Sequence, residues 1–159
     1  GEGNDTIRSF DGGDTIDAGL GNDVVYGGRS HDDISGGDGD DVLFGDTVLF
    51  ASRGNDTIDG GQGNDTMQGG YGADTFIFRA SEDGNNIITR IDGGGRDFEI
   101  RSDVVELHGF ADAVTSETVM TFVTESASGN AQFRTEGVTI EFDGISVADL
   151  SASDFDIIA

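Results

Sequence analysis

An aspartate returns every nine residues through the first half of this chain of 159 residues. An apolar residue follows each of these aspartates by two positions, and a glycine precedes each by two, with Ser30 as the one exception. The aspartates are Asp5, Asp14, Asp23, Asp32, Asp41, Asp56, Asp65 and Asp74, and their apolar partners are Ile7, Ile16, Val25, Ile34, Leu43, Ile58, Met67 and Phe76. A fixed short period indicates a repeat architecture, in which neighbouring copies must stack to share one core.

Each copy divides into a turn and a strand. The glycine-rich half, such as Gly-Gly-Asp-Gly at 36–39, can turn tightly because glycine takes positive φ without a Cβ clash. The half that begins at the aspartate, such as Asp-Thr-Ile-Asp at 56–59, is short and partly β-branched, as strands prefer. Side chains alternate along a strand, so the apolar residue points inward. Two copies make one coil of 18 residues, and stacked coils predict an all-β parallel β-roll, a solenoid like a β-helix.

Stacking gathers the aspartates at the two edges of the roll, because the turns of every second copy share an edge. The gap from Asp41 to Asp56 is nine residues plus six, and we expect residues 45–50 to bulge out as an insertion. The expected neighbours along the two edges are then the six pairs 5/23, 23/41, 41/65, 14/32, 32/56 and 56/74. Carboxylates stacked in this way repel each other unless a cation lies between them.

The charge balance narrows the classes of partner. The chain carries 32 acidic residues against eight arginines and no lysine, a net charge of −24, so it has no basic face for nucleic acid. No apolar run is long enough to span a membrane. Ca²⁺ accepts carboxylate and backbone carbonyl oxygens in flexible geometry, whereas Mg²⁺ demands a stricter arrangement. With no cysteine and only His31 and His108, a zinc or copper site is not expected.

The repeat Gly-Gly-x-Gly-x-Asp-x-apolar-x is clearest in GGDGDDVLF (36–44), GGQGNDTMQ (60–68) and GGYGADTFI (69–77). It resembles the calcium-binding nonapeptide of the RTX family of bacterial secreted proteins. The resemblance implies a β-roll over residues 1–77, with Ca²⁺ held between turns two repeats apart by the eight aspartates of the series. One ion for each of the six pairs would bring about +12 against a net charge of −13 in residues 1–77, so we expect folding to depend on the metal.

The second half of the chain predicts a cap. Segments of alternating polarity at 75–79, 86–91, 104–107, 120–124 and 138–142 predict strands that continue the roll and close its end. We expect residues 78–159 to form this β-rich cap, because an open end would expose the core and the strand edges. Residues 103–110 and 144–155 resemble the region that follows the repeats in RTX proteins. Residues 156–159, an acid followed by apolar residues, resemble a C-terminal signal for type I secretion, with an ordinary final strand as the alternative.

Catalysis is not expected within this chain. It contains neither HExxH nor GxSxG, and the sequence shows no partner for His31 or His108. We expect the four asparagines that precede series aspartates to stabilise turns rather than bind metal; they are Asn4, Asn22, Asn55 and Asn64. Because Gly1 falls in mid-pattern, a further domain, which would carry any catalytic activity, is expected before it.

Two functions remain open. The first is a secreted module that folds on Ca²⁺ outside the cell and supports the type I secretion and the stability of an attached N-terminal domain. The second is Ca²⁺-dependent binding of extracellular polysaccharide, as in modules attached to alginate epimerases, or adhesion. A polyanion would require a cluster of positive charge, and the candidates are Arg79, Arg90, Arg96, Arg101 and Arg134, unless they pair with nearby acids.

Overall fold

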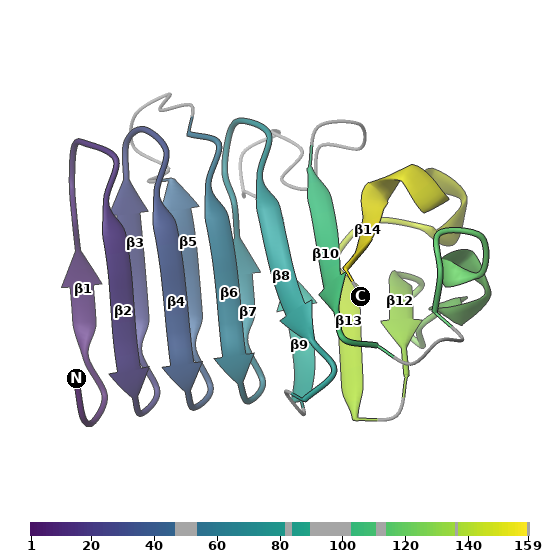
Figure 1. Cartoon of the computed structure of the whole chain (residues 1–159), viewed down its shortest axis with the longest axis horizontal. Coiled ribbons are helices and arrows are strands. Elements are labelled where there is room, and N and C mark those ends of the chain that lie inside the picture. The colour runs from purple at the N-terminus through teal and green to yellow at the C-terminus, as the bar shows by residue number, and fades with distance from the viewer. Residues whose placement is uncertain (47–53, 82–83, 90–102, 111–113, 136, 159) are drawn as a thin grey trace.

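The computed structural model describes residues 1–46, 54–81, 84–89, 103–110, 114–135 and 137–158. Within these residues two β-sheets face each other and form a flattened roll (Figure 1). One sheet has eight strands in the order β1-β3-β5-β7-β9-β13-β12-β11, and the other has six in the order β14-β10-β8-β6-β4-β2. In the repeats, consecutive strands therefore alternate between the two sheets.

The strands are β1 Thr6–Arg8, β2 Thr15–Leu20, β3 Val24–Gly28, β4 Asp33–Asp38, β5 Val42–Asp46, β6 Thr57–Gln62, β7 Thr66–Gln68, β8 Thr75–Arg79, β9 Gly84–Ile88, β10 Val104–His108, β11 Val123–Glu125, β12 Ala131–Arg134, β13 Val138–Phe142 and β14 Phe155–Ile158. Three short 3-10 helices complete the described parts: η1 Val119–Phe122, η2 Val147–Asp149 and η3 Ala152–Asp154. None of the helices in these parts is long and apolar enough to cross a bilayer.

Within each sheet the repeat strands are parallel and lie one coil apart. Thr6 in β1 pairs with Val24 in β3, and Val24 pairs with Val42 in β5, a step of 18 residues. The step from Val42 to Thr66 in β7 is 24 residues, because the insertion adds six. The predicted coil of two repeats and the predicted parallel β-roll are confirmed.

The apolar residue of each repeat points between the sheets, as the alternation predicts. Seven of the eight are buried, with Ile16 at 8 % exposure and Val25, Ile34, Leu43, Ile58, Met67 and Phe76 at 0 %. Ile7 is half-buried because β1 is the edge strand of its sheet. The stack of inward residues makes one continuous core along the roll.

The turns have a left-handed backbone two residues before seven of the eight series aspartates. Gly21, Gly39 and Gly63 have φ of 117°, 135° and 133° there. Ser30 holds the same place with φ of 80°, a value that side chains with a Cβ rarely adopt. The neighbouring coils therefore impose the turn even where the sequence has lost its glycine.

The insertion begins later than the sequence predicts. Gly45 and Asp46, which we expected in a bulge over 45–50, are the last residues of β5, and Asp46 pairs with Gly28. Residues 47–50 of the expected bulge lie outside the described residues. The strand continues because Gly45 and Asp46 stand where the two leading glycines of a repeat stand, so they extend β5 as Gly27 and Gly28 extend β3.

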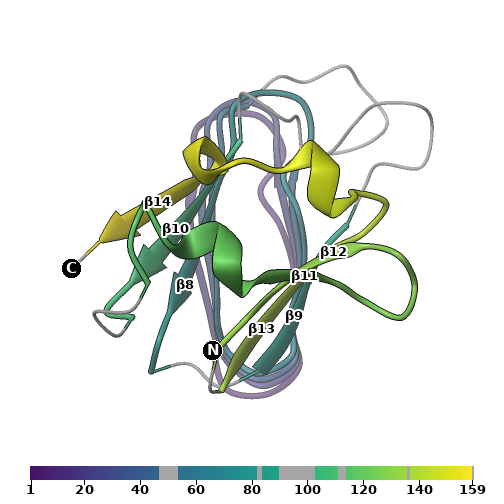
Figure 2. The same ribbon diagram turned by 90° about the vertical axis from the view of Figure 1, so that its right-hand side faces the viewer.

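Beyond the repeats both sheets continue and then close. Strands β10 and β14 extend one sheet in parallel from β8, and β13 extends the other from β9 before β12 and β11 turn antiparallel. Figure 2 shows the C-terminal segments lying across this end of the roll. Phe133 is fully buried there, and its ring centroid lies 5.9 Å from Phe110, 6.2 Å from Phe122 and 6.0 Å from Phe155. This aromatic cluster continues the core of the roll into the closed end.

The strand predictions in this half are largely confirmed. Segments 75–79 and 138–142 agree with β8 and β13, and 104–107 lacks only the last residue of β10. The prediction for 86–91 begins two residues after the start of β9, and residues 90–91 lie outside the described residues. The prediction for 120–124 is wrong in its first half, which forms η1, because the N–H groups of Thr118 and Val119 bond back to the Thr115 carbonyl.

Candidate metal-binding turns

A ladder of hydrogen bonds joins the series aspartates along one edge of the roll. The backbone N–H of Asp5 donates to Oδ1 of Asp23 at 2.7 Å, and that of Asp23 donates to Oδ1 of Asp41 at 2.8 Å. Asp41 donates in the same way to Oδ1 of Asp65 at 3.0 Å. The last rung runs from the Asp65 N–H to Oδ1 of Asn86 at 2.8 Å. Each carboxylate is thus tied to the turn one coil before it.

The other edge carries a matching ladder. Asp14 donates its backbone N–H to Oδ1 of Asp32, Asp32 donates to Asp56, and Asp56 donates to Asp74, each at 2.9 Å. The last rung runs from Asp74 to Oδ1 of Asp103 at 3.0 Å. All six predicted neighbour pairs are therefore confirmed as neighbours. The rung from Asp32 to Asp56 is as short as the others, so the insertion does not break the stacking.

Sequence reasoning missed Asn86 and Asp103, the residues that end the ladders. They are 3 % and 2 % exposed, and each has an apolar residue two positions later, Ile88 and Val105, as the series aspartates do. The period conceals them, because Asn86 lies 21 residues after Asp65 and Asp103 lies 29 after Asp74. A search for the aspartate-x-apolar pattern without a fixed period, with asparagine allowed, would have found both.

Residues that directly precede series aspartates form a second, outer ladder, in which the N–H donates to the side chain of the preceding coil. Asn22 donates its N–H to Oδ1 of Asn4 at 3.0 Å, and Asp40 donates to Oδ1 of Asn22 at 3.1 Å. On the other edge His31 takes this place, and its Nδ1 accepts the N–H of Asn55 at 2.7 Å. The expectation that the asparagines stabilise the turns is confirmed, and His31 has a partner that the sequence did not show.

Burial leaves one oxygen of several series carboxylates without a protein partner. Asp23, Asp41 and Asp56 are each 1 % exposed, and Asp32 is 3 % exposed. Oδ1 of each accepts a ladder hydrogen bond, whereas Oδ2 is buried with no hydrogen-bond partner, and the same holds for Oδ2 of half-buried Asp14. A buried carboxylate oxygen without a partner is costly. These atoms are therefore candidate ligands for a cation.

At the first glycine of the repeat, a carbonyl oxygen of the next coil lies close to the carboxylate of the series aspartate. A Cβ atom on Gly36 would overlap both Oδ2 of Asp41 and the carbonyl oxygen of Gly60. A Cβ on Gly45 would likewise overlap Oδ2 of Asp56 and the carbonyl oxygen of Gly69. The missing side chain thus lets a carboxylate oxygen and a carbonyl oxygen from adjacent coils approach one another. That pairing matches the mixed oxygen ligands that Ca²⁺ takes.

The electrostatics show how unfavourable the charged carboxylates are on their own. Burial raises the pKa of Asp56 to about 8, and the nearby charges of Asp74, Asp46 and Asp32 add to the effect. Burial raises the pKa of Asp41 to about 6, with a further contribution from Asp23 and Asp40. The ladder hydrogen bonds oppose both shifts. A cation beside these groups would favour their ionised form.

Side chains alone do not complete such a site. Among the described residues, no three His, Cys, Asp or Glu side chains converge on one point. An ion held between two turns would thus have two aspartates and would draw its other ligands from backbone carbonyls or water. This oxygen-only set suits Ca²⁺ and offers no nitrogen or sulfur ligand for zinc.

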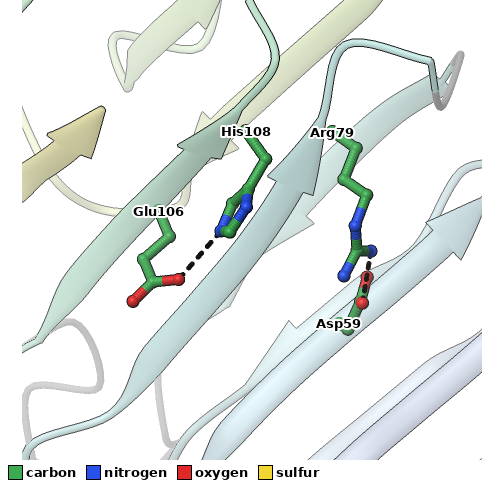
Figure 3. A network of polar contacts seen from close by, with 4 residues as sticks. All are labelled: Asp59, Arg79, Glu106 and His108. Carbon is green, nitrogen blue, oxygen red and sulfur yellow. Dashed lines mark hydrogen bonds and ion pairs between the residues drawn. The ribbon is translucent and has the colours of Figure 1, made fainter. Parts of the chain in front are cut away.

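The outer face of the six-stranded sheet also carries two polar pairs (Figure 3). Nε2 of His108 lies 2.9 Å from Oε2 of Glu106, and Arg79 forms an ion pair with Asp59. Each of these residues is bound to a neighbour on the same sheet. They form a structural surface network, and His108 has a partner that the sequence did not show.

Comparisons with known proteins agree with this geometry. A family model for the RTX calcium-binding nonapeptide repeat, in four copies, matches residues 1–25, 8–43 and 44–76. Among solved structures, the AlgE6R3 subunit from the Azotobacter vinelandii mannuronan C5-epimerase is similar, with a TM-score of 0.57 and 23 % identity. The match covers 98 % of this chain and 80 % of that one. A search of curated protein sequences finds no match.

The roll and its acidic, glycine-lined turns are those of a calcium-binding β-roll module. Residues 1–76 are repeats of the RTX calcium-binding nonapeptide family, as the sequence predicts. The likeness to the epimerase subunit extends the shared β-roll fold over nearly the whole chain.

Proposed function

We propose that Ca²⁺ binds between same-edge turns, with Asp5, Asp14, Asp23, Asp32, Asp41, Asp56, Asp65 and Asp74 as the carboxylate ligands. The observation that carries the proposal is the buried Oδ2 of Asp23, Asp41 and Asp56, which has no hydrogen-bond partner while Oδ1 is held by the ladder. Six neighbouring pairs give about six ions, each shared by two coils. Asp103 is a further candidate ligand, because it occupies the next place after Asp74.

Binding of this kind would couple folding to the metal. Each ion would bridge turns that are 18 or 24 residues apart, so the site exists only in the folded roll. A ligand that binds only the folded state stabilises it by mass action. Extracellular calcium modules have dissociation constants of roughly 10⁻⁴–10⁻³ M, above the Ca²⁺ concentration of a cytosol. The repeats would therefore be unfolded inside a cell and folded outside it.

This behaviour suits a secreted protein exported by a type I system, in which an unfolded chain passes a narrow channel and folds on arrival. We propose this role for the chain, with residues 1–77 as the calcium-binding roll and residues 78–159 as its cap. The module would also support the stability of a domain attached before Gly1. Residues 156–159 are the candidate export signal, and three of them lie in β14, which pairs with β10. Export of a secretion reporter should fall when Asp156 is replaced by asparagine.

Calcium titration of two variants tests the ligand assignment. In one, Asp23 and Asp41 become asparagine; in the other, exposed Asp17 and Asp33 become asparagine, which changes the net charge equally. Asparagine retains an oxygen acceptor for the ladder N–H groups but no charge for the ion. The first variant should bind fewer Ca²⁺ ions by isothermal titration calorimetry, and the second should match the parent. Equal stoichiometry in both variants would contradict the assignment.

The polysaccharide alternative has less support from the described residues. Arg79 forms an ion pair with Asp59, as expected if the arginines neutralise nearby acids and do not form a polysaccharide site. Arg90, Arg96 and Arg101 lie outside the described residues. The similarity to the epimerase subunit concerns the fold. Titration with an anionic polysaccharide, with and without Ca²⁺, should give no binding; saturable binding in the presence of Ca²⁺ would favour this alternative.

A further inference from the structure

The two sheets of the roll differ in the chemistry of their outer faces. The residues one and three positions after a series aspartate point outward, because the apolar residue between them points into the core. In the six-stranded sheet, places of this kind hold Asp17, Asp33 and Asp59, and Glu106 follows Asp103 in the same way. In β1, β3, β5 and β7 of the other sheet, none of these places holds an acidic residue. A chain with a net charge of −24 therefore has one sheet surface, the acid-free face, on which these places carry no negative charge.

The acid-free face is apolar at its centre. Val24 pairs in register with Val42 of β5, and Tyr26 pairs with Phe44 in the next outward row. The two rings stack with their centroids 4.9 Å apart and 8° between their planes. These four side chains are half-buried, and Ile87, which continues the row of Val42 in β9, is 39 % exposed. Apolar side chains that gather on one surface mark a place where another molecule binds.

Opposite charges lie at the two margins of the acid-free face. Arg8 stands at the β1 margin, where its guanidinium carbon lies 4.7 Å from the ring centroid of Tyr26. Glu141 of β13, which pairs in register with β9, stands at the other margin. Hydrogen bonds from Ser128 and Asn130 lower the pKa of Glu141, so its carboxylate is ionised at neutral pH. The face is thus positive at one margin and negative at the other.

We propose that the acid-free face binds a second copy of the chain, sheet against sheet, about a two-fold axis that runs along the strands. Such an axis lays β1 of each copy over the far margin of the other, so Arg8 faces the partner's Glu141 and the apolar centres meet between these pairs. A symmetric contact through the outer face of the six-stranded sheet would instead bring carboxylates such as Asp17 and Asp33 against like charges. The charge pattern therefore selects the acid-free face for self-association.

Sedimentation velocity of the full chain in saturating Ca²⁺, between about 10 µM and about 1 mM protein, tests the inference. A few short strands make a small interface, so we expect a weak dimer with a dissociation constant of about 0.1 mM. Val42→Asp introduces a charge at the centre of the face and should raise this constant at least about tenfold. The matched control, Thr57→Asp, places the same charge directly after a series aspartate on the outer face of the six-stranded sheet and should leave the constant unchanged.

A double-mutant cycle tests the pairing of the two margins. Glutamine in place of Arg8 or Glu141 removes one charge, and Glu141→Gln retains an acceptor for Ser128 and Asn130. Each single variant should weaken the dimer about two- to fivefold, and the double variant should be no weaker than either single one. Additive effects would overturn the proposed axis.

A parent chain that remains monomeric at about 1 mM would overturn the contact. Equal weakening by Val42→Asp and Thr57→Asp would also overturn it, because the charge would then act without regard to the face. Val24→Asp, on the neighbouring strand, takes the place of Val42→Asp if circular dichroism shows that the latter does not fold in Ca²⁺. A monomeric parent that binds phosphatidylcholine vesicles, and a Val42→Asp variant that does not, would assign the face to a lipid surface and overturn the inference as well.

Discussion

The backbone N–H of Asp23 donates a 2.8 Å hydrogen bond to Oδ1 of Asp41, which lies 18 residues further along the chain and one coil further along the roll. This contact fixes Asp41 so that its Oδ2 faces away from the N–H and is buried without a hydrogen-bond partner. The same relationship repeats along both edges. In Asp23, Asp32, Asp41 and Asp56, one carboxylate oxygen accepts the hydrogen bond that orders the turn, and the other is available to a cation.

Position along the ladder should determine how strongly a substitution affects calcium binding. Asp23 accepts from Asp5 and donates to Asp41, whereas Asp5 begins the described ladder and is exposed. Asp23→Ala should therefore lower the cooperativity of Ca²⁺ binding more than Asp5→Ala, and should cost about 1–3 kcal/mol of stability through the lost acceptor. Hill coefficients from calcium titrations measure this difference. Equal coefficients for the two variants would show that the coils are not coupled as described.

The stacked core should carry much of the stability once Ca²⁺ is bound. Leu43 is fully buried between the sheets, and its replacement by alanine should reduce the free energy of unfolding by about 2–5 kcal/mol. Leu20, which is 49 % exposed, is the matched control, and Leu20→Ala should cost less than about 1 kcal/mol. Urea unfolding in saturating Ca²⁺ measures both values. A similar loss in the two variants would argue against a core of inward repeat residues.

Replacing Asn86, the residue that ends one ladder, should create an additional calcium site. Asn86 accepts the Asp65 N–H through its amide oxygen, and aspartate is able to accept the same hydrogen bond while adding a charge. Asn86→Asp should therefore pair with Asp65 as the other neighbours pair and should add one Ca²⁺ ion to the calorimetric stoichiometry. Asn64→Asp, at an exposed outer-ladder position, is the control that should add none. An unchanged ion count for Asn86→Asp would mean that adjacent aspartates are insufficient to form a site.

In the presence of a chelator, any folded fraction should lose stability as the pH rises. The folded-state pKa of Asp41 is about 6 and that of Asp56 is about 8, both above the ordinary value of 3.8. Their contribution to stability is complete below about pH 4 and is lost as the pH rises through 6 for Asp41 and through 8 for Asp56. Thermal unfolding in EDTA between pH 4 and pH 8 measures this effect. A melting temperature that rises between pH 4 and pH 8 would contradict this prediction.

The repeat made most of the roll predictable from the sequence. The period of nine determines which residues point inward. Because side chains alternate along a strand, Leu43 points between the two sheets and is buried. It also places Asp32 beside Asp56 across the insertion, because the two flanking copies must still stack. At these positions the local sequence pattern and the packing of the whole roll agree, so the nine-residue period predicts both burial and neighbours correctly.

Prediction failed where the chain leaves the period. Asp103 takes the next place in its ladder, yet 29 residues separate it from Asp74, so no spacing rule finds it. The sequence pattern placed Asp46 in the inserted loop, because the repeat that begins at Gly45 has an aspartate in place of its second glycine; Asp46 is the last residue of β5. The 3-10 helix Val119–Phe122 depends on a turn at Thr115 and on packing of Phe122 against Phe133, which are tertiary effects. Contacts between distant segments determine such positions, and the nine-residue period alone does not reveal them.

Far-UV circular dichroism of the chain with millimolar Ca²⁺ and after excess EDTA tests most directly whether bound cations hold the acidic edges together. The net charge of −24 and the buried oxygens at Asp23, Asp41 and Asp56 predict a strand-rich spectrum with Ca²⁺ that chelation converts to that of an unfolded chain. Restoring Ca²⁺ should restore the strands. A strand-rich spectrum that persists unchanged in EDTA at neutral pH would contradict the account.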